Sequence, residues 1–312
     1  MKYFASFVSG AHSIVGDRLA KFPNAELAVE ELQDGLVVFE STLKQEQLSE
    51  LRFFNNVYQL LATDTAVSEL PIPDLPKDST VIVRVREGSQ PTTPPDELTE
   101  RVLASHLTPS AHNPDNELLL WRRKDGRMLW GLALPKAGFK MRRLEQGELR
   151  PELAHILGLV AGLDSKDIVL DPFAGYGAIV RECLQGFHCT EVIAMEHNEH
   201  LIPHLKSIPR LIALHGDAGS LPHINTRGVD RVITDPPWGE FSHMSSDELW
   251  RLYHGAFMQI HRVLRTKGVV VMLTAAPFLP DVAAETSFDI VKQYPILVNG
   301  RKATIYKLRK IG

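Results

Sequence analysis

The chain has 312 residues, of which 44% are hydrophobic and 23% are charged, and its formal net charge is -4. This is the composition of a globular protein with enough apolar surface for a core, and the length favours two domains over one. The acidic balance excludes a generally basic coat for nucleic acid, although a local basic patch is compatible with it.

The two cysteines, Cys183 and Cys189, are six residues apart, which matches neither a CxxC redox pair nor half of a zinc site. We therefore expect no disulfide framework and a reducing compartment, the cytoplasm. The N-terminal apolar run is too short for a signal peptide, and the longest apolar stretch, residues 268–280, is shorter than the roughly 20 residues of a membrane helix. We expect no membrane segment, and the oligomeric state is taken as monomeric.

The first part of the chain alternates strand-like and helix-like segments. Short β-branched and aromatic runs at residues 2–8 and 35–40 predict strands with a helix between them. Apolar residues at near-helical spacing over residues 43–54 predict a second helix. Residues 1–68 are therefore expected to form a small α+β module.

A proline-rich connector follows at residues 69–79 and marks a first boundary. Beyond it we expect a strand at 81–87, a helix ending near His106, and two strands that flank the turn Lys124-Asp125-Gly126. The sequence thus predicts a second module at residues 69–137 and a basic linker at residues 138–150.

From Pro151 onward, helices alternate with short apolar strands, expected at residues 168–171, 192–196, 211–215, 231–235 and 269–273. Such runs are typical of a parallel sheet covered by helices on both faces. The last two expected strands, 289–297 and 302–308, are separated by the hairpin signal Asn299-Gly300. Residues 151–312 are therefore predicted to form a doubly wound, Rossmann-like α/β domain with a terminal antiparallel hairpin.

Residues 168–183 place a buried strand, an acidic residue, a glycine-bearing turn and a helix in direct succession. Gly175 and Gly177 would let the backbone approach a ligand, and the helix starting near Ala178 would point N–H groups at a small anionic group. Asp171 would repel a pyrophosphate, whereas it would accept a hydrogen bond from the ammonium of a methionine-like zwitterion. The pattern favours S-adenosylmethionine over a dinucleotide.

Two further carboxylates follow the next expected strands. Glu196 stands nineteen residues after Gly177, at a strand end where it can accept from both ribose hydroxyls, and His197 follows near the expected adenine. Asp217, next to Ala218, could accept from the adenine amino group. Each carboxylate taken alone could instead be a helix cap or a turn residue.

The most specific short motif is Asp235-Pro236-Pro237-Trp238, at the end of the fourth expected strand. Prolines fix φ and remove donors, so the Asp235 carboxylate and the Pro236 carbonyl can both accept from one exocyclic amino group. That geometry would leave the nitrogen facing a sulfonium methyl group. Trp238 offers a flat face for an unstacked base. The alternative is a rigid proline turn with a core tryptophan.

These motifs resemble class I methyltransferases that act on amino groups. Over nearly the whole chain, the sequence is similar to the THUMP-associated RNA methyltransferases: residues 138–163 and 169–183 look like their linker and cofactor loop, and residues 2–19 and 34–42 look like their ferredoxin-like N-terminal module. The resemblance implies methyl transfer from S-adenosylmethionine to the N2 amino group of a guanosine, in tRNA, with a short THUMP-like module in front.

By position, the resemblance implies a cofactor site at Asp171, Phe173, Gly175, Gly177, Glu196 and Asp217, and catalysis at Asp235, Pro236 and Trp238. The adjoining Pro172, Ala174, His197, Ala218 and Pro237 complete the expected site. Two alternatives stay open. An adenine-N6 methyltransferase would use the same motif geometry, and a non-catalytic RNA-binding protein would keep the same fold.

A local excess of cations lies between the two expected halves, where residues 122–150 hold nine Lys or Arg against three Asp or Glu. Contact with RNA phosphates is one use for them, and we assign it to Arg122, Arg123, Lys124, Lys136, Lys140, Arg142 and Arg143. A solvated hairpin face would account for the same charges. His197, His200 and His204 lie at helical spacing without a completing ligand pattern, so we expect no metal.

Overall fold

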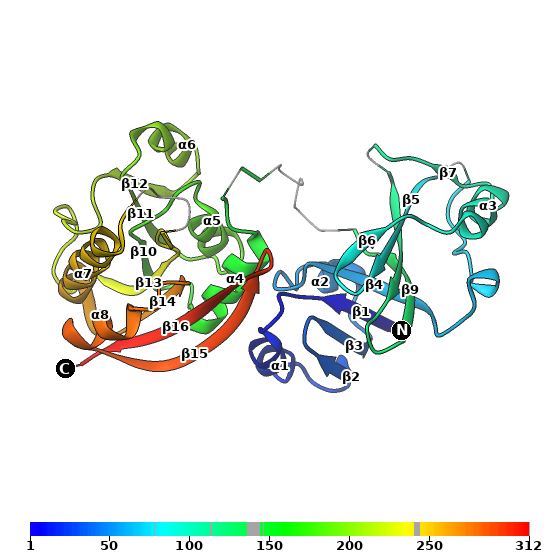
Figure 1. The fold of residues 1–312 in the computed structure, drawn as a ribbon, viewed down its shortest axis with the longest axis horizontal. Helices are drawn as coiled ribbons and strands as arrows, with labels where there is room; N and C mark the ends of the chain where they lie inside the picture. The colour runs from blue at the N-terminus through cyan, green and yellow to red at the C-terminus, as the bar shows by residue number, and fades with distance from the viewer. Residues whose placement is uncertain (78, 113, 136–143, 146, 240–243, 312) are drawn as a thin grey trace. The chain divides into compact units, whose positions relative to one another are not determined.

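The computed structural model describes residues 1–77, 79–112, 114–135, 144–145, 147–239 and 244–311, and it divides into two compact units (Figure 1). The N-terminal unit comprises Met1–Phe7 and Leu19–Lys140, and the C-terminal unit comprises Val8–Arg18 and Met141–Gly312. Each unit is built on a β-sheet of its own. No helix in the described ranges is long and apolar enough to cross a membrane.

Among its described residues, the N-terminal unit forms a nine-stranded sheet in the order β2-β3-β1-β4-β9-β8-β5-β6, with β7 beside β5. The strands are β1 (Lys2–Ser6), β2 (Leu27–Gln33), β3 (Leu36–Ser41), β4 (Asn56–Thr63), β5 (Thr80–Glu87), β6 (Gln90–Thr92), β7 (Thr108–Pro109), β8 (Asn116–Arg122) and β9 (Met128–Ala133). The helices are α2 (Gln45–Ser49), the short η1 (Val67–Glu69) and α3 (Asp96–Ala104). Because β4 pairs with β9, the sheet runs through both predicted N-terminal modules; their division into 1–68 and 69–137 stays a prediction.

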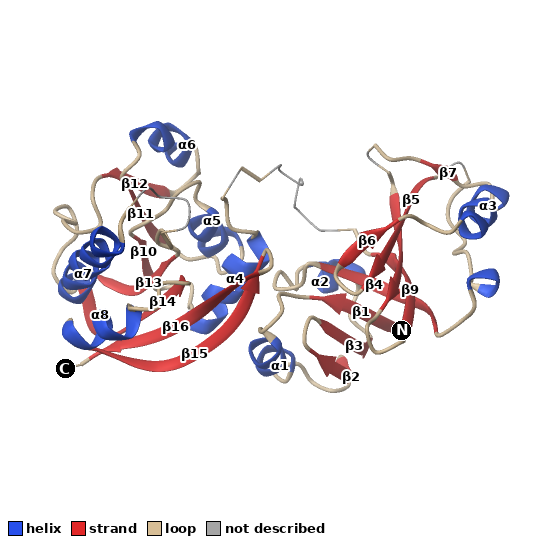
Figure 2. Ribbon diagram, viewed as in Figure 1, coloured by secondary structure: helices blue, strands red, loops and turns tan. Residues whose placement is uncertain are grey.

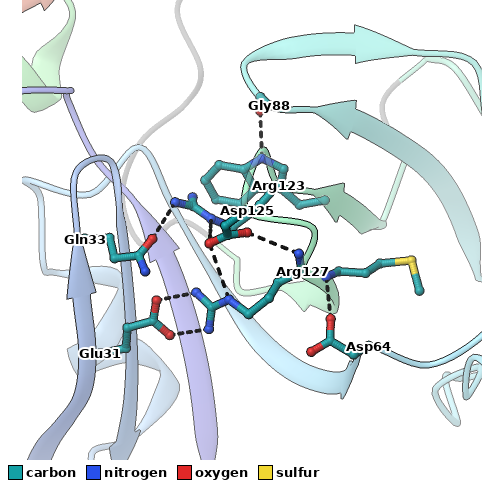
Figure 3. A network of polar contacts seen from close by, with 9 residues as sticks. Glu31, Gln33, Asp64, Gly88, Arg123, Asp125 and Arg127 are labelled. Atoms are coloured by element: carbon teal, nitrogen blue, oxygen red, sulfur yellow. Dashed lines mark hydrogen bonds and ion pairs between the residues drawn. The ribbon is translucent and has the colours of Figure 1, made fainter.

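The turn between β8 and β9 is the hairpin that the sequence predicts. Gly126 has a φ of +87°, and the Arg123 N–H donates to the Arg127 carbonyl at 2.8 Å. Side chains then tie this turn to β2: Arg127 forms a bidentate ion pair with Glu31, and Arg123 Nη2 donates to Gln33 Oε1 at 3.0 Å (Figure 3). These contacts join segments that are 90 or more residues apart in the chain.

In the described part of the C-terminal unit, seven strands form a sheet in the order β12-β11-β10-β13-β14-β16-β15. The strands are β10 (Ile168–Asp171), β11 (Glu191–Glu196), β12 (Leu211–His215), β13 (Val229–Thr234), β14 (Leu264–Thr274), β15 (Phe288–Val298) and β16 (Arg301–Lys310). The first five in spatial order run parallel, and the last two pair antiparallel. The predicted doubly wound sheet with a terminal hairpin is therefore confirmed, and Asn299 and Gly300 take positive φ in its turn.

Helices lie on both faces of this sheet (Figure 2). They are α4 (Pro151–Ala161), α5 (Ala178–Gln185), η2 (Glu199–Leu201), α6 (Ile202–Lys206), α7 (Ser246–Val263) and α8 (Leu279–Glu285). A further helix, α1 (His12–Leu19), precedes β2 in the chain. The residues before α1 are held by the Leu297 N–H, which donates to the Ser9 carbonyl at 3.1 Å.

The helix α7 has a well-defined start and a continuous apolar face. It begins at a capping box, in which the Glu248 N–H donates to Ser245 Oγ and the Ser245 N–H donates to the Glu248 carboxylate. Apolar residues that recur every three or four positions then pack it onto the sheet; they are Leu249, Tyr253, Phe257 and Ile260. The cap and this apolar stripe fix which side chains α7 presents to the sheet.

Two expectations for the N-terminal unit differ from the structure. The predicted helix over residues 43–54 is wrong for most of its length. Only Gln45–Ser49 are helical, as α2, because β4 already begins at Asn56. The strands β2, β4, β6 and β7 carried no prediction. In β2 and β4 a bulge interrupts the pairing, between Val29 and Glu31 and between Leu60 and Ala62, so neither strand shows a clean alternation.

We predict that Arg127→Ala and Glu31→Ala each lower the free energy of unfolding by about 1 to 3 kcal/mol, because each leaves a half-buried charge without its bidentate partner. The double variant should lose less than the sum of the two, since both changes remove one pair. Urea unfolding combined with amide hydrogen exchange in β9 measures the loss. The matched control is Arg122→Ala, which breaks a more exposed pair with Glu87 and should cost under about 0.5 kcal/mol. Strictly additive losses at positions 31 and 127 would contradict a coupled pair.

Candidate active site

A cleft of about 240 Å³ opens at the carboxyl ends of β10 and β13, within the C-terminal unit. Ligands of open α/β sheets bind at this edge. Of the predicted site residues, the cleft is lined by Asp171, Phe173, Ala174, Gly175 and Asp235. The rest of its lining is Gly147, Glu148, Leu149, Tyr176, Ala178, Ile179 and Leu201. The cleft therefore joins the glycine loop to the first residue of the proline motif.

The glycine loop after β10 has the conformation that its sequence predicts. Gly175 and Gly177 have φ of +52° and +83°, and α5 begins at Ala178. A Cβ atom on Gly177 would lie 2.9 Å from both Leu205 Cδ2 and Ile208 Cδ1, so the loop packs against α6 and the turn after it. Any side chain at Gly177 would meet both strain and a clash.

Asp171, the last residue of β10, is buried, with 1% of its surface exposed. Its Oδ1 accepts from the Thr234 hydroxyl at 2.7 Å and from the Phe173 N–H at 3.1 Å. Its Oδ2 is buried and has no hydrogen-bond partner among the described residues. Burial raises the pKa of Asp171 to about 7, and the neighbouring Asp235 and Glu196 carboxylates add to the rise.

Glu196 stands at the end of β11, and its two oxygens reach two different backbone groups. Oε2 accepts from the Gly175 N–H at 2.7 Å, and Oε1 accepts from the Asn198 N–H at 2.8 Å. The carboxylate thus ties β11 to the glycine loop. The predicted ribose contact remains a proposal, which the two further lone pairs of this carboxylate would allow. His197 is exposed, and its carbonyl lies 3.1 Å from His215 Nε2.

Asp217 lies in the exposed turn after β12, followed by the buried Ala218. Its Oδ1 accepts from the Gly219 N–H at 2.6 Å, so it serves as a turn residue here. This is the local alternative that the sequence left open, and a carboxylate in such a turn keeps acceptors for a ligand as well. Contact with an adenine amino group stays a prediction.

The proline motif leaves β13 directly after Thr234. Asp235 lines the cleft, and burial raises its pKa to about 7, while the hydrogen bond from Trp238 acts in the opposite direction. The Trp238 indole Nε1 donates to Asp235 Oδ1 at 2.8 Å. The Pro237 carbonyl accepts from the Tyr253 hydroxyl at 2.9 Å, and Pro236 is buried.

Three contributors to the site were missed by sequence reasoning. Thr234 holds Asp171, Tyr253 holds the proline motif, and residues 147–149 form part of the cleft wall. Thr234 offered only its position, directly before a motif at the end of a strand. Nothing in the sequence indicates a role for Tyr253 in the site. Its place on the apolar stripe of a helix predicts only a core residue.

The basic residues assigned to RNA are partly engaged within the N-terminal unit. Arg122 Nη1 donates to Glu87 Oε1 at 3.1 Å, and the side chain of Arg123 is only 14% exposed, between Gln33 and the ring of Trp121. Lys124 is exposed at the hairpin turn. Lys136, Lys140, Arg142 and Arg143 lie outside the described residues. In the described part of the chain, no group of three or more His, Cys, Asp or Glu could hold a metal ion.

Comparison with known proteins agrees with this geometry. Residues 205–302 match the family model described as UPF0020, RMKL-like, methyltransferase domain. A curated relative, the tRNA (guanine(10)-N2)-dimethyltransferase of Methanothermobacter thermautotrophicus, is 26% identical over 156 residues, which are 47% of this chain and 45% of the relative. The aligned part thus spans under half of that protein's length.

Solved structures are similar over the whole chain. TrmN from Thermus thermophilus has a TM-score of 0.77 at 21% identity, with 99% of each chain covered. SMU.472, a methyltransferase homologue crystallised with S-adenosylhomocysteine, has a TM-score of 0.73 at 13% identity, with 100% of this chain and 98% of that chain covered.

The fold and the site therefore define a class I methyltransferase domain, the class that uses S-adenosylmethionine. The match of residues 205–302 to an RMKL-like methyltransferase domain confirms the predicted resemblance to the RNA methyltransferases. The residues present fit that cofactor. The unpartnered Oδ2 of Asp171 is an acceptor that an ammonium group would satisfy, and the open backbone at Gly175, with no atom within 4 Å of a Cβ position, leaves room for a ligand.

The two raised pKa values predict how stability depends on pH. Asp171 and Asp235 have pKa values of about 7 in the folded protein against 3.8 as the ordinary value, so the folded state binds more protons between these limits. The stability of the ligand-free protein should therefore fall as pH rises from about 4 to 7, on the order of 2 kcal/mol for each group.

Asp171→Asn and Asp235→Asn should each reduce this fall, because an amide carries no charge to bury. Urea unfolding of the ligand-free protein at pH 5 and pH 8 measures the difference. Asp289→Asn, at an exposed position on β15, is the control and should keep the wild-type difference. An unchanged difference in both cleft variants would contradict the burial of ionised carboxylates.

Proposed function

We propose that this protein is an RNA methyltransferase that moves a methyl group from S-adenosylmethionine to the exocyclic N2 amino group of a guanosine in tRNA. The observation that carries the proposal is that Asp235 opens into the same cleft as Asp171 and Gly175. A cofactor held by the glycine loop and an amino group held by the proline motif would therefore meet in one space. Guanine and tRNA are supported by the name of the curated relative.

The cofactor would be held mainly by groups at three strand ends. When bound, it supplies an electrophilic methyl group on a sulfonium. Asp171 Oδ2 accepts from its ammonium group, and the backbone at Gly175 and Gly177 lies against its amino-acid end, next to the N–H groups at the start of α5. Glu196 serves the ribose, and Asp217 serves the adenine. A cation beside Asp171 also favours the ionised form of this carboxyl.

The proline motif would hold the target base. The Asp235 carboxylate and the Pro236 carbonyl accept the two hydrogens of the amino group, which turns the lone pair of the nitrogen toward the methyl group. Formation of the nitrogen–methyl bond would break the methyl–sulfur bond and release the cofactor as a neutral thioether. The positively charged nitrogen would then lose a proton to Asp235 Oδ2. Because burial raises the pKa of Asp235 to about 7, this carboxyl is a competent proton acceptor near neutral pH.

Trp238 has two roles in this proposal. Its indole N–H donates to Asp235 Oδ1, which fixes the carboxylate and leaves Oδ2 for the substrate. Its ring face remains available for stacking on the base, a contact worth roughly 1 to 3 kcal/mol. RNA phosphates are assigned to Arg122, Arg123, Lys124, Lys136, Lys140, Arg142 and Arg143. Of the three that the structure describes, the hairpin residue Lys124 is exposed.

We predict that the purified full chain transfers labelled methyl groups to tRNA and that digestion yields N2-methylguanosine by nucleoside mass spectrometry. Asp235→Ala should lower kcat by at least about 100-fold, because the amino group loses its charged acceptor. Binding of S-adenosylmethionine to this variant, measured by calorimetry, should stay within about threefold of wild type, since Asp235 belongs to the substrate side.

Asp289→Ala, which removes an exposed carboxylate of the same unit, is the matched control and should keep full activity. N6-methyladenosine as the product would replace guanine by adenine in the proposal. Cofactor binding without transfer to any nucleic acid would instead favour a non-catalytic RNA-binding protein.

A further inference from the structure

A series of hydrogen bonds, buried at Tyr253 and Thr274 and partly buried at Pro237, connects the proline motif to the sheet through α7. The Tyr253 hydroxyl donates to the Pro237 carbonyl at 2.9 Å and lies 2.7 Å from Thr274 Oγ1. The Ala276 N–H in turn donates to Thr274 Oγ1 at 3.0 Å. Tyr253 and Thr274 are each 1% exposed, so water does not compete for these groups. The series joins α7, the end of β14 and the loop after β13.

The direction of each hydrogen bond follows from the groups involved. A carbonyl only accepts, so the single hydroxyl hydrogen of Tyr253 goes to Pro237. The contact between the two hydroxyls must then be made by Thr274, which donates to Tyr253 Oη. Burial raises the pKa of Tyr253 well above its ordinary value, so the phenol keeps its hydrogen throughout the physiological range.

The composition of the motif explains why such a support is needed. Pro236 and Pro237 have no N–H, so backbone hydrogen bonds can hold these two residues only through their carbonyls. The Pro236 carbonyl has a proposed use as an acceptor for substrate, which leaves the Pro237 carbonyl as the point of attachment. The loop also closes tightly on α7 one residue later, where a Cβ atom on Gly239 would lie 3.0 Å from Leu249 Cδ2.

We propose that Tyr253 is a positioning residue of the methyl transfer: it fixes the Pro237 carbonyl, and with it the peptide plane before Trp238 and the two acceptors Asp235 and Pro236. The inference rests on the proposed amino-group methylation. Tyr253 itself does not line the cleft, so it acts through the loop and not on the substrate. A phenylalanine would fill the same apolar site, where Phe278 packs edge-on against the ring, and would remove only the hydrogen bond.

The test compares Tyr253→Phe with wild type in two measurements on the full chain. In methyl transfer to tRNA, kcat should fall at least about fivefold, with KM for S-adenosylmethionine and for tRNA within about twofold, because the lost bond orders the reacting groups and binds neither ligand. In fluorine NMR of protein labelled with 5-fluorotryptophan, the Trp238 signal should shift while those of Trp121 and Trp130 stay in place. The Trp238 signal is assigned with Trp238→Phe.

Three further variants separate positioning from packing. Thr274→Val, which removes the donor to Tyr253, should reproduce both effects, and Thr274→Ser, which keeps it, should restore both. Tyr306→Phe, which removes a tyrosine hydroxyl elsewhere in the same core, should behave as wild type. If Tyr253→Phe does not fold, Thr274→Val carries the test.

Several outcomes would overturn the inference. One is a kcat within twofold of wild type in both Tyr253→Phe and Thr274→Val. Another is a change confined to KM. A third is a lower kcat while the fluorine signal of Trp238 does not move. If wild type transfers no methyl group to any nucleic acid, the proposed function fails, and the fluorine spectra decide the positioning role alone: a shifted Trp238 signal supports it and an unmoved one overturns it.

Discussion

The hydrogen bond between the Thr234 hydroxyl and Asp171 Oδ1 is the constraint on which the site depends. Because β10 and β13 are parallel neighbours, the glycine loop and the proline motif leave the sheet side by side, and this bond joins the two strand ends. The bond also satisfies only one oxygen of a buried carboxylate and leaves Oδ2 without a partner among the described residues. Burying an ionised carboxylate is unfavourable unless its oxygens are paired. A cationic group of a ligand is the partner that this arrangement lacks.

Around that bond, the two loops are held in different ways because their backbones differ. The glycine loop has N–H groups to offer, and the Glu196 carboxylate holds it through the Gly175 N–H. The proline motif has none at Pro236 and Pro237, so the structure holds it through a carbonyl and the Tyr253 hydroxyl. An acidic side chain supports the loop that supplies donors, and a hydroxyl donor supports the loop that supplies acceptors.

In the N-terminal unit, the number of basic residues in a segment does not predict how many of them are available to bind a phosphate. The sequence does not distinguish the basic residues that follow Arg122, yet Arg127 is paired with Glu31 and Arg123 donates to Gln33 (Figure 3). The guanidinium of Arg123 also lies over the ring of Trp121. Glu31 and Gln33 come from β2, an edge strand that the sequence did not predict. A cation that already holds a carboxylate gains less from a phosphate than an unpaired one. Whether each of these cations is available to bind a phosphate therefore depends on the tertiary structure.

The sequence by itself determined the features that depend on neighbouring residues. Periodicity predicted the strands of the C-terminal sheet, and glycine at Gly175 and Gly177 predicted the positive φ values that the loop adopts, because both signals act within a few residues. Tertiary structure alone decided that β2 and β4 complete one sheet despite their bulges, that Asp171 and Asp235 share a cleft with raised pKa values, and that Tyr253 reaches Pro237. Burial and contacts between distant segments arise only when the whole unit packs, so no local pattern records them.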